Sequence, residues 1–169
     1  MPVCKPFTDS LKRAAIECCD FADASQVVDI GCGDGLVLAQ LLARWPHLAG
    51  VAFDRPDRIS GAESKLAEWQ LGERLRLVAG DVLASVPSGA DTYLLSGALR
   101  GRDDAEAVRI LSNVRAAAAP GARVMAMEMP DERTDREFRD LFERAGLRYE
   151  RALGTAAPVS VLMATQAEG

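Results

Sequence analysis

The chain has 169 residues, of which 49% are hydrophobic and 27% are charged, and this length and composition are typical of one globular domain. Its net charge of −5 disfavours nucleic acid as the main partner, because phosphate binding requires a basic surface. No apolar run approaches the roughly 18 residues of a membrane span, and charged residues interrupt the N-terminal segment, so no signal peptide is expected. We therefore expect one cytoplasmic domain over residues 1–169 with a small-molecule substrate and no membrane or nucleic-acid partner.

Apolar periodicity and turn residues predict strands that alternate with helices. The predicted strands cover 26–30, 50–54, 75–79, 91–96, 123–128, 147–153 and 159–165. The predicted helices cover 11–18, 36–45, 60–70, 103–119 and 134–145. The first strand lacks clean alternation, as a parallel strand buried on both faces does. The last two strands are joined by a connection too short for a helical crossover, so we expect them to pair antiparallel.

Residues 27–35 read V-V-D-I-G-C-G-D-G and lead from a strand through a turn into a helix. Glycine at Gly31, Gly33 and Gly35 removes Cβ atoms and permits positive φ, so a ligand can touch the main chain. The spacing differs from the G-x-G-x-x-G of a dinucleotide site, and Asp34 would repel a pyrophosphate. A turn that serves only packing is the alternative. Cys32 lies within it, where a small packed side chain is favoured over a reactive thiol.

Carboxylates follow the next two predicted strands. Asp54 ends the second strand about 20 residues beyond the turn, where a ribose diol is usually bound. Asp81 follows the third strand in Gly80-Asp81, which is also a common turn pair. We interpret Asp54 as a ligand-binding residue, with a cap or turn as the alternative.

The remaining chemistry-bearing residues give weaker signals. The four cysteines, Cys4, Cys18, Cys19 and Cys32, lack metal-ligand spacing, so we expect reduced thiols and no metal. The single histidine, His47, precedes the second strand, away from the edge where chemistry is expected.

The turn, the two acids and the closing antiparallel pair together resemble the class I S-adenosylmethionine-dependent methyltransferases. More narrowly, the chain resembles the catalytic domain of bacterial and plant small-molecule O-methyltransferases, from about Leu11 onward. The segments that follow this pattern are 27–35, 53–56, 79–81, 94–96, 104–111 and 119–121. The resemblance implies a Rossmann-like α/β fold whose seven-stranded, mostly parallel sheet has an antiparallel last strand and helices on both faces. It also implies S-adenosylmethionine as cofactor and a role in secondary metabolism.

The resemblance assigns parts of this cofactor to particular residues. The three glycines would cradle its methionine part, and Asp54 would accept hydrogen bonds from both ribose hydroxyls. Asp81 would receive the adenine amino group, with Val82 or Leu83 packing against the ring. The predicted cofactor site also includes Asp29, Cys32, Arg55, Gly80 and Ser96.

Three departures from the family pattern concern the acceptor. The family has a helical dimerisation domain before the cofactor domain, and this chain begins almost at the latter, so we expect a homodimer or a partner that completes the acceptor pocket. The family's His-Asp-Trp is here Arg100-Gly101-Arg102. That histidine is the family's general base, which an always-protonated arginine cannot replace. The long insertion after the fifth strand is also absent.

Two hypotheses follow. The first is a methyltransferase with Arg100 at the acceptor. Methyl transfer then requires either an acidic acceptor or a general base, for which Asp103, Asp104 and Glu128 are the candidates. The alternative for Arg100 is an arginine that merely lies at the surface. The second is a protein that binds S-adenosylmethionine without transferring methyl, as a cyclisation or rearrangement catalyst or as a partner subunit. A nicotinamide-dependent enzyme is disfavoured by the turn spacing.

Overall fold

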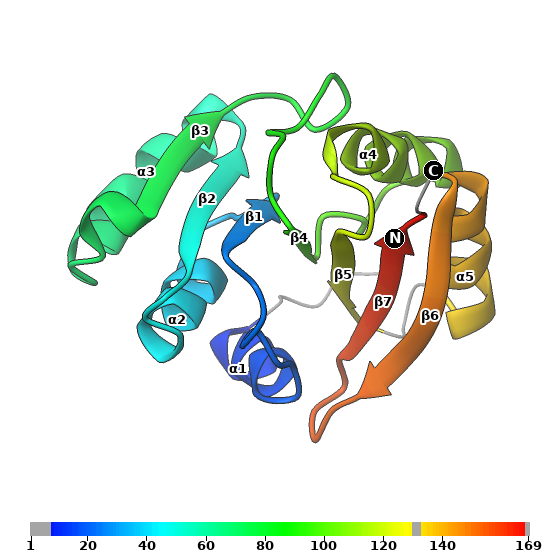
Figure 1. Ribbon diagram of the computed structural model, residues 1–169, viewed down its shortest axis with the longest axis horizontal. Helices are drawn as coiled ribbons and strands as arrows, with labels where there is room; N and C mark the ends of the chain where they lie inside the picture. The colour runs from blue at the N-terminus through cyan, green and yellow to red at the C-terminus, as the bar shows by residue number, and fades with distance from the viewer. Residues whose placement is uncertain (1–7, 130–132, 168–169) are drawn as a thin grey trace.

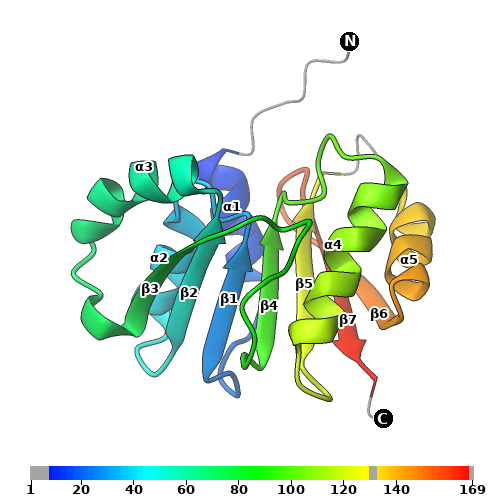
Figure 2. The same ribbon diagram turned by 90° about the horizontal axis from the view of Figure 1, so that it is seen from above.

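The computed structural model describes residues 8–129 and 133–167. Within these ranges, seven strands form one sheet in the order β3-β2-β1-β4-β5-β7-β6. The strands are β1 (Gln26–Ile30), β2 (Ala49–Asp54), β3 (Leu75–Ala79), β4 (Thr92–Ser96), β5 (Arg123–Glu128), β6 (Leu147–Gly154) and β7 (Ser160–Gln166). Strands β1 to β5 pair in parallel, whereas β7 is antiparallel to both β5 and β6 (Figure 2). The predicted fold class and the antiparallel closing pair are confirmed.

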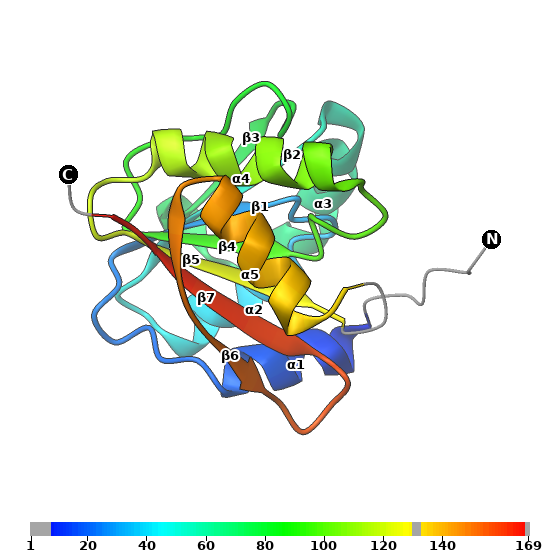
Figure 3. The same ribbon diagram turned by 90° about the vertical axis from the view of Figure 1, so that its right-hand side faces the viewer.

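Helices cover both faces of the sheet (Figures 1 and 3). They are α1 (Asp9–Glu17), α2 (Leu36–Arg44), α3 (Pro56–Ala67), α4 (Asp104–Ala117) and α5 (Asp135–Arg144). Apolar side chains of α1, α2 and α3 share one buried cluster, and those of α4 and α5 share the cluster on the other face. The central strands are therefore buried on both sides, which is why β1 reads as a continuous apolar run around Asp29.

Two local predictions are corrected by the structure. Helix α3 begins at Pro56 and not near residue 60, because proline at the first helical position presets φ and has no N–H to leave unpaired. A short 3-10 helix, Gly72–Arg74, precedes β3 and was not predicted. The earlier start of α3 brings another turn of helix to the carboxyl end of β2.

The order of the strands creates a crevice at one edge of the sheet. The chain builds β1, β2 and β3 outward, then crosses back so that β4 lies on the other side of β1. Val28 of β1 is paired with Val51 of β2 and with Tyr93 of β4. Open α/β sheets bind ligands at such a switch point, outside the carboxyl ends of the strands. The glycine turn leaves β1 at this edge.

Candidate functional site

The three glycines of the turn have positive φ angles, but their missing Cβ atoms serve different purposes. A Cβ at Gly31 would lie 3.1 Å from the Cβ of Ala98, and one at Gly35 would lie 2.7 Å from Cδ1 of Leu66. A Cβ at Gly33 would meet nothing within 4 Å. Gly35 therefore permits α2 to pack against α3, whereas Gly33 presents bare backbone to open space.

Asp54 at the end of β2 is tied to this turn. Its Oδ2 accepts a hydrogen bond from the Gly33 amide at 2.9 Å, and its Oδ1 accepts one from the Arg55 amide at 2.7 Å. Two backbone donors hold the carboxylate in one orientation, and each oxygen keeps a second lone pair for further donors. Asp54 is thus a pre-oriented acceptor at the rim of the crevice.

Asp29 lies within β1 and is completely buried. Its Oδ1 accepts a hydrogen bond from the Ser96 hydroxyl at 3.0 Å, whereas Oδ2 has no hydrogen-bond partner. Burial raises the pKa of Asp29 to about 7, against the opposing effects of the Ser96 hydrogen bond and of Lys12. A buried acceptor without a donor is costly, and a ligand that brought an N–H or a positive charge to Oδ2 would relieve this cost.

Helix α1 contributes a residue that sequence reasoning missed. Lys12 Nζ donates to Asp34 Oδ1 at 3.0 Å, with its side chain only 12% exposed. Asp34 also accepts from the Leu36 amide at 3.2 Å. Lys12 therefore fastens α1 to the turn and balances part of its acidic charge. The position of Lys12 beside the apolar stripe of α1 was the only signal for this contact.

These elements surround a cleft of about 480 Å³, which is within the usual size of a small-molecule site. Its lining residues are Gly31, Gly33, Asp54, Arg55, Arg58, Asp81, Val82, Gly97, Ala98, Arg100 and Arg102. The glycine turn and the two predicted acids thus meet at one cavity. Arg58, Gly97, Ala98 and Arg102 were missed; Arg58 lies in the turn of α3 that the predicted start excluded.

Five predicted cofactor residues lie outside the lining of the cleft, namely Asp29, Cys32, Gly35, Gly80 and Ser96. Cys32 is 3% exposed within the apolar cluster under α1 and α2, and burial raises the pKa of its thiol. A Cβ at Gly80 would lie 2.5 Å from the Phe53 ring, so this glycine serves packing. Ser96 contacts Asp29. For these residues the structure provides a packing or positioning reason.

The predicted catalytic carboxylates have structural contacts. Asp103 caps α4 by accepting from the Glu106 amide at 2.8 Å. Asp104 accepts from Arg133 Nη2 at 3.0 Å, and Glu128, 2% exposed, accepts from the Leu99 amide at 3.2 Å. None of the three carboxylates lines the cleft, whereas Arg100 does. These contacts do not support the predicted role of the acids as general bases.

Within residues 8–129 and 133–167, no group of three histidine, cysteine or acidic side chains gathers as metal ligands would. No helix in the same ranges is long and apolar enough to cross a bilayer. The ring of His47 lies 3.3 Å from the Phe21 carbonyl oxygen, at the opposite edge of the sheet from the cleft.

The fold and the cleft are those of an α/β protein with a candidate small-molecule site at the switch point of a mostly parallel sheet. Residues 8–140 match the family model of the O-methyltransferase domain. Phenazine O-methyltransferase PhzM of Lysobacter antibioticus is 31% identical over 181 residues, covering 94% of this chain and 53% of the relative. The mitomycin biosynthesis 6-O-methyltransferase of Streptomyces lavendulae is 33% identical over 166 residues, covering 85% of this chain and 48% of that protein.

Solved structures agree with these matches. The crystal structure of LaPhzM superposes with a TM-score of 0.89 at 31% identity, covering 95% of this chain and 55% of that one. The mitomycin 7-O-methyltransferase MmcR gives a TM-score of 0.86 at 31% identity, over 94% of this chain and 53% of that one. The chain belongs to the O-methyltransferase domain family, whose members use S-adenosylmethionine, as the motifs predicted. It spans about half the length of the curated relatives it matches.

Proposed function

We propose that this chain binds S-adenosylmethionine in the cleft and serves methyl transfer to a small-molecule acceptor. The observation that carries this proposal is the convergence of the open backbone at Gly33 with Asp54 and Asp81 on one cavity. Family membership supports it, as does a relative whose name places it in mitomycin biosynthesis.

The residues present fit this cofactor. Asp29 Oδ2 lacks a donor at a fully buried position, which suits the cationic end of the cofactor, and a side chain at Gly33 would fill the space over the turn. Asp54 has oxygens free to accept ribose hydroxyls, and Asp81, which accepts from the Leu83 amide with Oδ1 at 2.9 Å, has Oδ2 for the adenine amino group. When bound, the cofactor supplies an electrophilic methyl group on a sulfonium.

For the acceptor, we propose a molecule that is anionic at neutral pH, such as an aromatic carboxylate or an acidic phenol. Four arginines, Arg55, Arg58, Arg100 and Arg102, line the cleft together with Asp54 and Asp81. Two of them also pair with acids outside the lining, Arg55 with Asp57 at 3.2 Å and Arg102 with Glu106 at 3.4 Å. An acceptor that has already lost its proton needs no general base, and guanidinium groups bind carboxylates and phenolates well.

The names of two relatives support an acidic acceptor. They are the phenazine-1-carboxylate N-methyltransferase of Pseudomonas aeruginosa, 40% identical over 101 residues, and the 3-amino-4-hydroxybenzoate 4-O-methyltransferase of Streptomyces cremeus, 38% identical over 109 residues. Both names describe aromatic acids.

Cofactor binding is tested by titration calorimetry with S-adenosylhomocysteine and, separately, NADH. We expect binding of the former only, and a loss of about 10- to 100-fold in Asp54→Asn, because an amide cannot accept two hydroxyl protons as the carboxylate does. Asp57→Asn is the matched control, since Asp57 is an exposed acid nearby that pairs with Arg55 at 3.2 Å. Equal affinity in both variants would contradict the assignment of Asp54.

Methyl transfer is tested with aromatic carboxylates and the corresponding carboxamides, by measuring S-adenosylhomocysteine release and product mass. We expect turnover with acids only, and weaker acceptor binding in Arg100→Gln. Tight cofactor binding without release for any acceptor would favour the non-methylating hypothesis. The homodimer or partner expected from the sequence stays a prediction, which sedimentation velocity at micromolar concentration tests.

A further inference from the structure

The loop between β4 and α4 forms one wall of the cleft. Gly97, Ala98, Arg100 and Arg102 of this loop are among the lining residues. Ala98 also lies against the glycine turn, because a Cβ at Gly31 would be only 3.1 Å from its own Cβ. The position of the loop therefore determines both the width of the cleft and the packing of the turn.

Side chains from outside the loop hold its backbone at Leu99, which is completely buried. The Leu99 amide donates to Glu128 Oε1 at 3.2 Å, and Arg133 Nη1 donates to the Leu99 carbonyl at 3.4 Å. Arg133 Nη2 donates to the Arg102 carbonyl at 2.6 Å. The loop is thus held through both backbone groups of Leu99 and again near its end, at Arg102.

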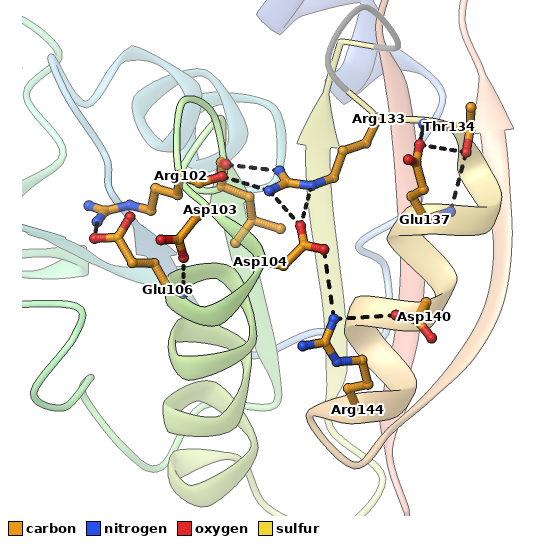
Figure 4. A network of polar contacts seen from close by, with 10 residues as sticks. Arg102, Asp103, Asp104, Glu106, Arg133, Thr134, Glu137, Asp140 and Arg144 are labelled. Atoms are coloured by element: carbon orange, nitrogen blue, oxygen red, sulfur yellow. Dashed lines mark hydrogen bonds and ion pairs between the residues drawn. The ribbon is translucent and has the colours of Figure 1, made fainter.

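The guanidinium of Arg133 is itself held in place (Figure 4). Its Nε and Nη2 donate to Asp104 Oδ1 at 3.1 and 3.0 Å, with the side chain 10% exposed. Asp104 Oδ2 lies 3.7 Å from Arg144 of α5, which also reaches Asp140 at 3.4 Å. A planar guanidinium with several donors can engage a carboxylate and two carbonyls at once, which a lysine cannot do.

We infer that Arg133 is a positioning residue for the cofactor and acceptor cleft, which it keeps open by holding the wall that carries Arg100 and Arg102. This inference rests on the proposed function, because it assumes that the cleft is the ligand site. Arg133 does not line the cleft, so it acts through the loop backbone. Asp104 contributes indirectly, because it accepts hydrogen bonds from Arg133 and so orients its guanidinium.

The test compares four variants of the full chain. Arg133→Met removes every polar contact that the Arg133 side chain makes to the loop, and Arg133→Lys keeps the positive charge on a single donor nitrogen. Asp104→Asn weakens the orientation of Arg133 but leaves its carbonyl contacts. Arg144→Met is the matched control, because it removes an arginine from the same carboxylate without touching the loop. Each is measured by hydrogen exchange of the peptide spanning 97–103 and by calorimetry with S-adenosylhomocysteine, with circular dichroism to confirm folding.

We expect Arg133→Met to bind S-adenosylhomocysteine about tenfold more weakly and to speed exchange in residues 97–103 by about tenfold, with exchange in β1 unchanged. Arg133→Lys and Asp104→Asn should be intermediate, and Arg144→Met should match the wild type. Affinity and loop exchange in Arg133→Met within twofold of the wild type would overturn the inference. If Arg133→Met does not fold, the same criterion applies to Arg133→Lys. Failure of the wild type to bind would instead contradict the proposed function.

Discussion

Replacement of Asp29 by asparagine is expected to stabilise the ligand-free protein at high pH while weakening cofactor binding. The reason is the buried carboxylate, whose pKa burial raises from 3.8 to about 7. At about 1.4 kcal/mol for each factor of ten in proton affinity, this rise corresponds to about 4 kcal/mol against the ionised form in the folded state. Asparagine keeps the shape and the bond to Ser96 but has no charge.

The pH dependence has a definite sign. In the unfolded chain Asp29 ionises near pH 4, whereas in the folded protein it keeps its proton until about pH 7. Folding therefore takes up a proton between these values, so this residue lowers stability by about 1.4 kcal/mol for each pH unit as the pH rises through that window. Above pH 7 the cost is complete and constant.

Asparagine introduces a cost of its own, because its buried NH2 group replaces Oδ2 and lacks an acceptor, at about 1 to 3 kcal/mol. We therefore expect Asp29→Asn to unfold with a free energy about 1 to 3 kcal/mol above the wild type at pH 8 and about equal to it at pH 5. Urea unfolding of both proteins at pH 5, 6, 7 and 8 measures this directly.

Asp29→Asn should weaken cofactor binding, although it stabilises the ligand-free protein at high pH. At pH 8 the wild-type carboxylate is ionised and lacks a donor, so a cationic ligand would offset the cost of burying the charge. We therefore expect Asp29→Asn to bind S-adenosylhomocysteine, whose amino group is cationic, at least about tenfold more weakly than the wild type.

The unfolding measurements can refute the stability argument. If Asp29→Asn were destabilised relative to the wild type by the same amount at pH 5 and at pH 8, the charge of Asp29 would not be the cause.

Two further predictions separate packing from ligand contact. Gly33→Ala should cost about 1 kcal/mol of stability, because of the positive φ at this position, and should weaken S-adenosylhomocysteine binding at least tenfold. Gly35→Ala should lose roughly 1 to 3 kcal/mol more stability than Gly33→Ala, because its Cβ would collide with Leu66. Unfolding and calorimetry on both variants measure these effects. Tyr93→Phe should cost about 1 to 2 kcal/mol and leave binding unchanged, because the Tyr93 hydroxyl lies 3.0 Å from two backbone carbonyl oxygens away from the cleft; an altered affinity would count against that role.

The fold could be predicted because local and global signals agree. The apolar run of β1, the glycine turn and the helix after it each follow from residue type and spacing, and the sheet requires the same elements. Parallel strands end at the same edge of the sheet, which is why Asp54 and Asp81 both line one cleft; their role in binding stays a prediction. The start of α3 differs from the predicted one because a proline after a strand can either end that strand or begin a helix, and Pro56 does the latter.

The acceptor side could not be predicted to the same extent, because its residues act through contacts between segments distant in sequence. Asp103 and Asp104 look alike in the chain, yet one caps its own helix and the other binds Arg133, which lies 29 positions further on. Nothing in the sequence near Arg133 indicates that its donors meet the carbonyls of Leu99 and Arg102. A carboxylate that follows a strand is a good candidate for a ligand-binding residue only when it does not form an ion pair with a cationic side chain from another element. At this edge of the sheet, the side chains that line the cleft are therefore a better guide to function than proximity of an acid to the end of a strand.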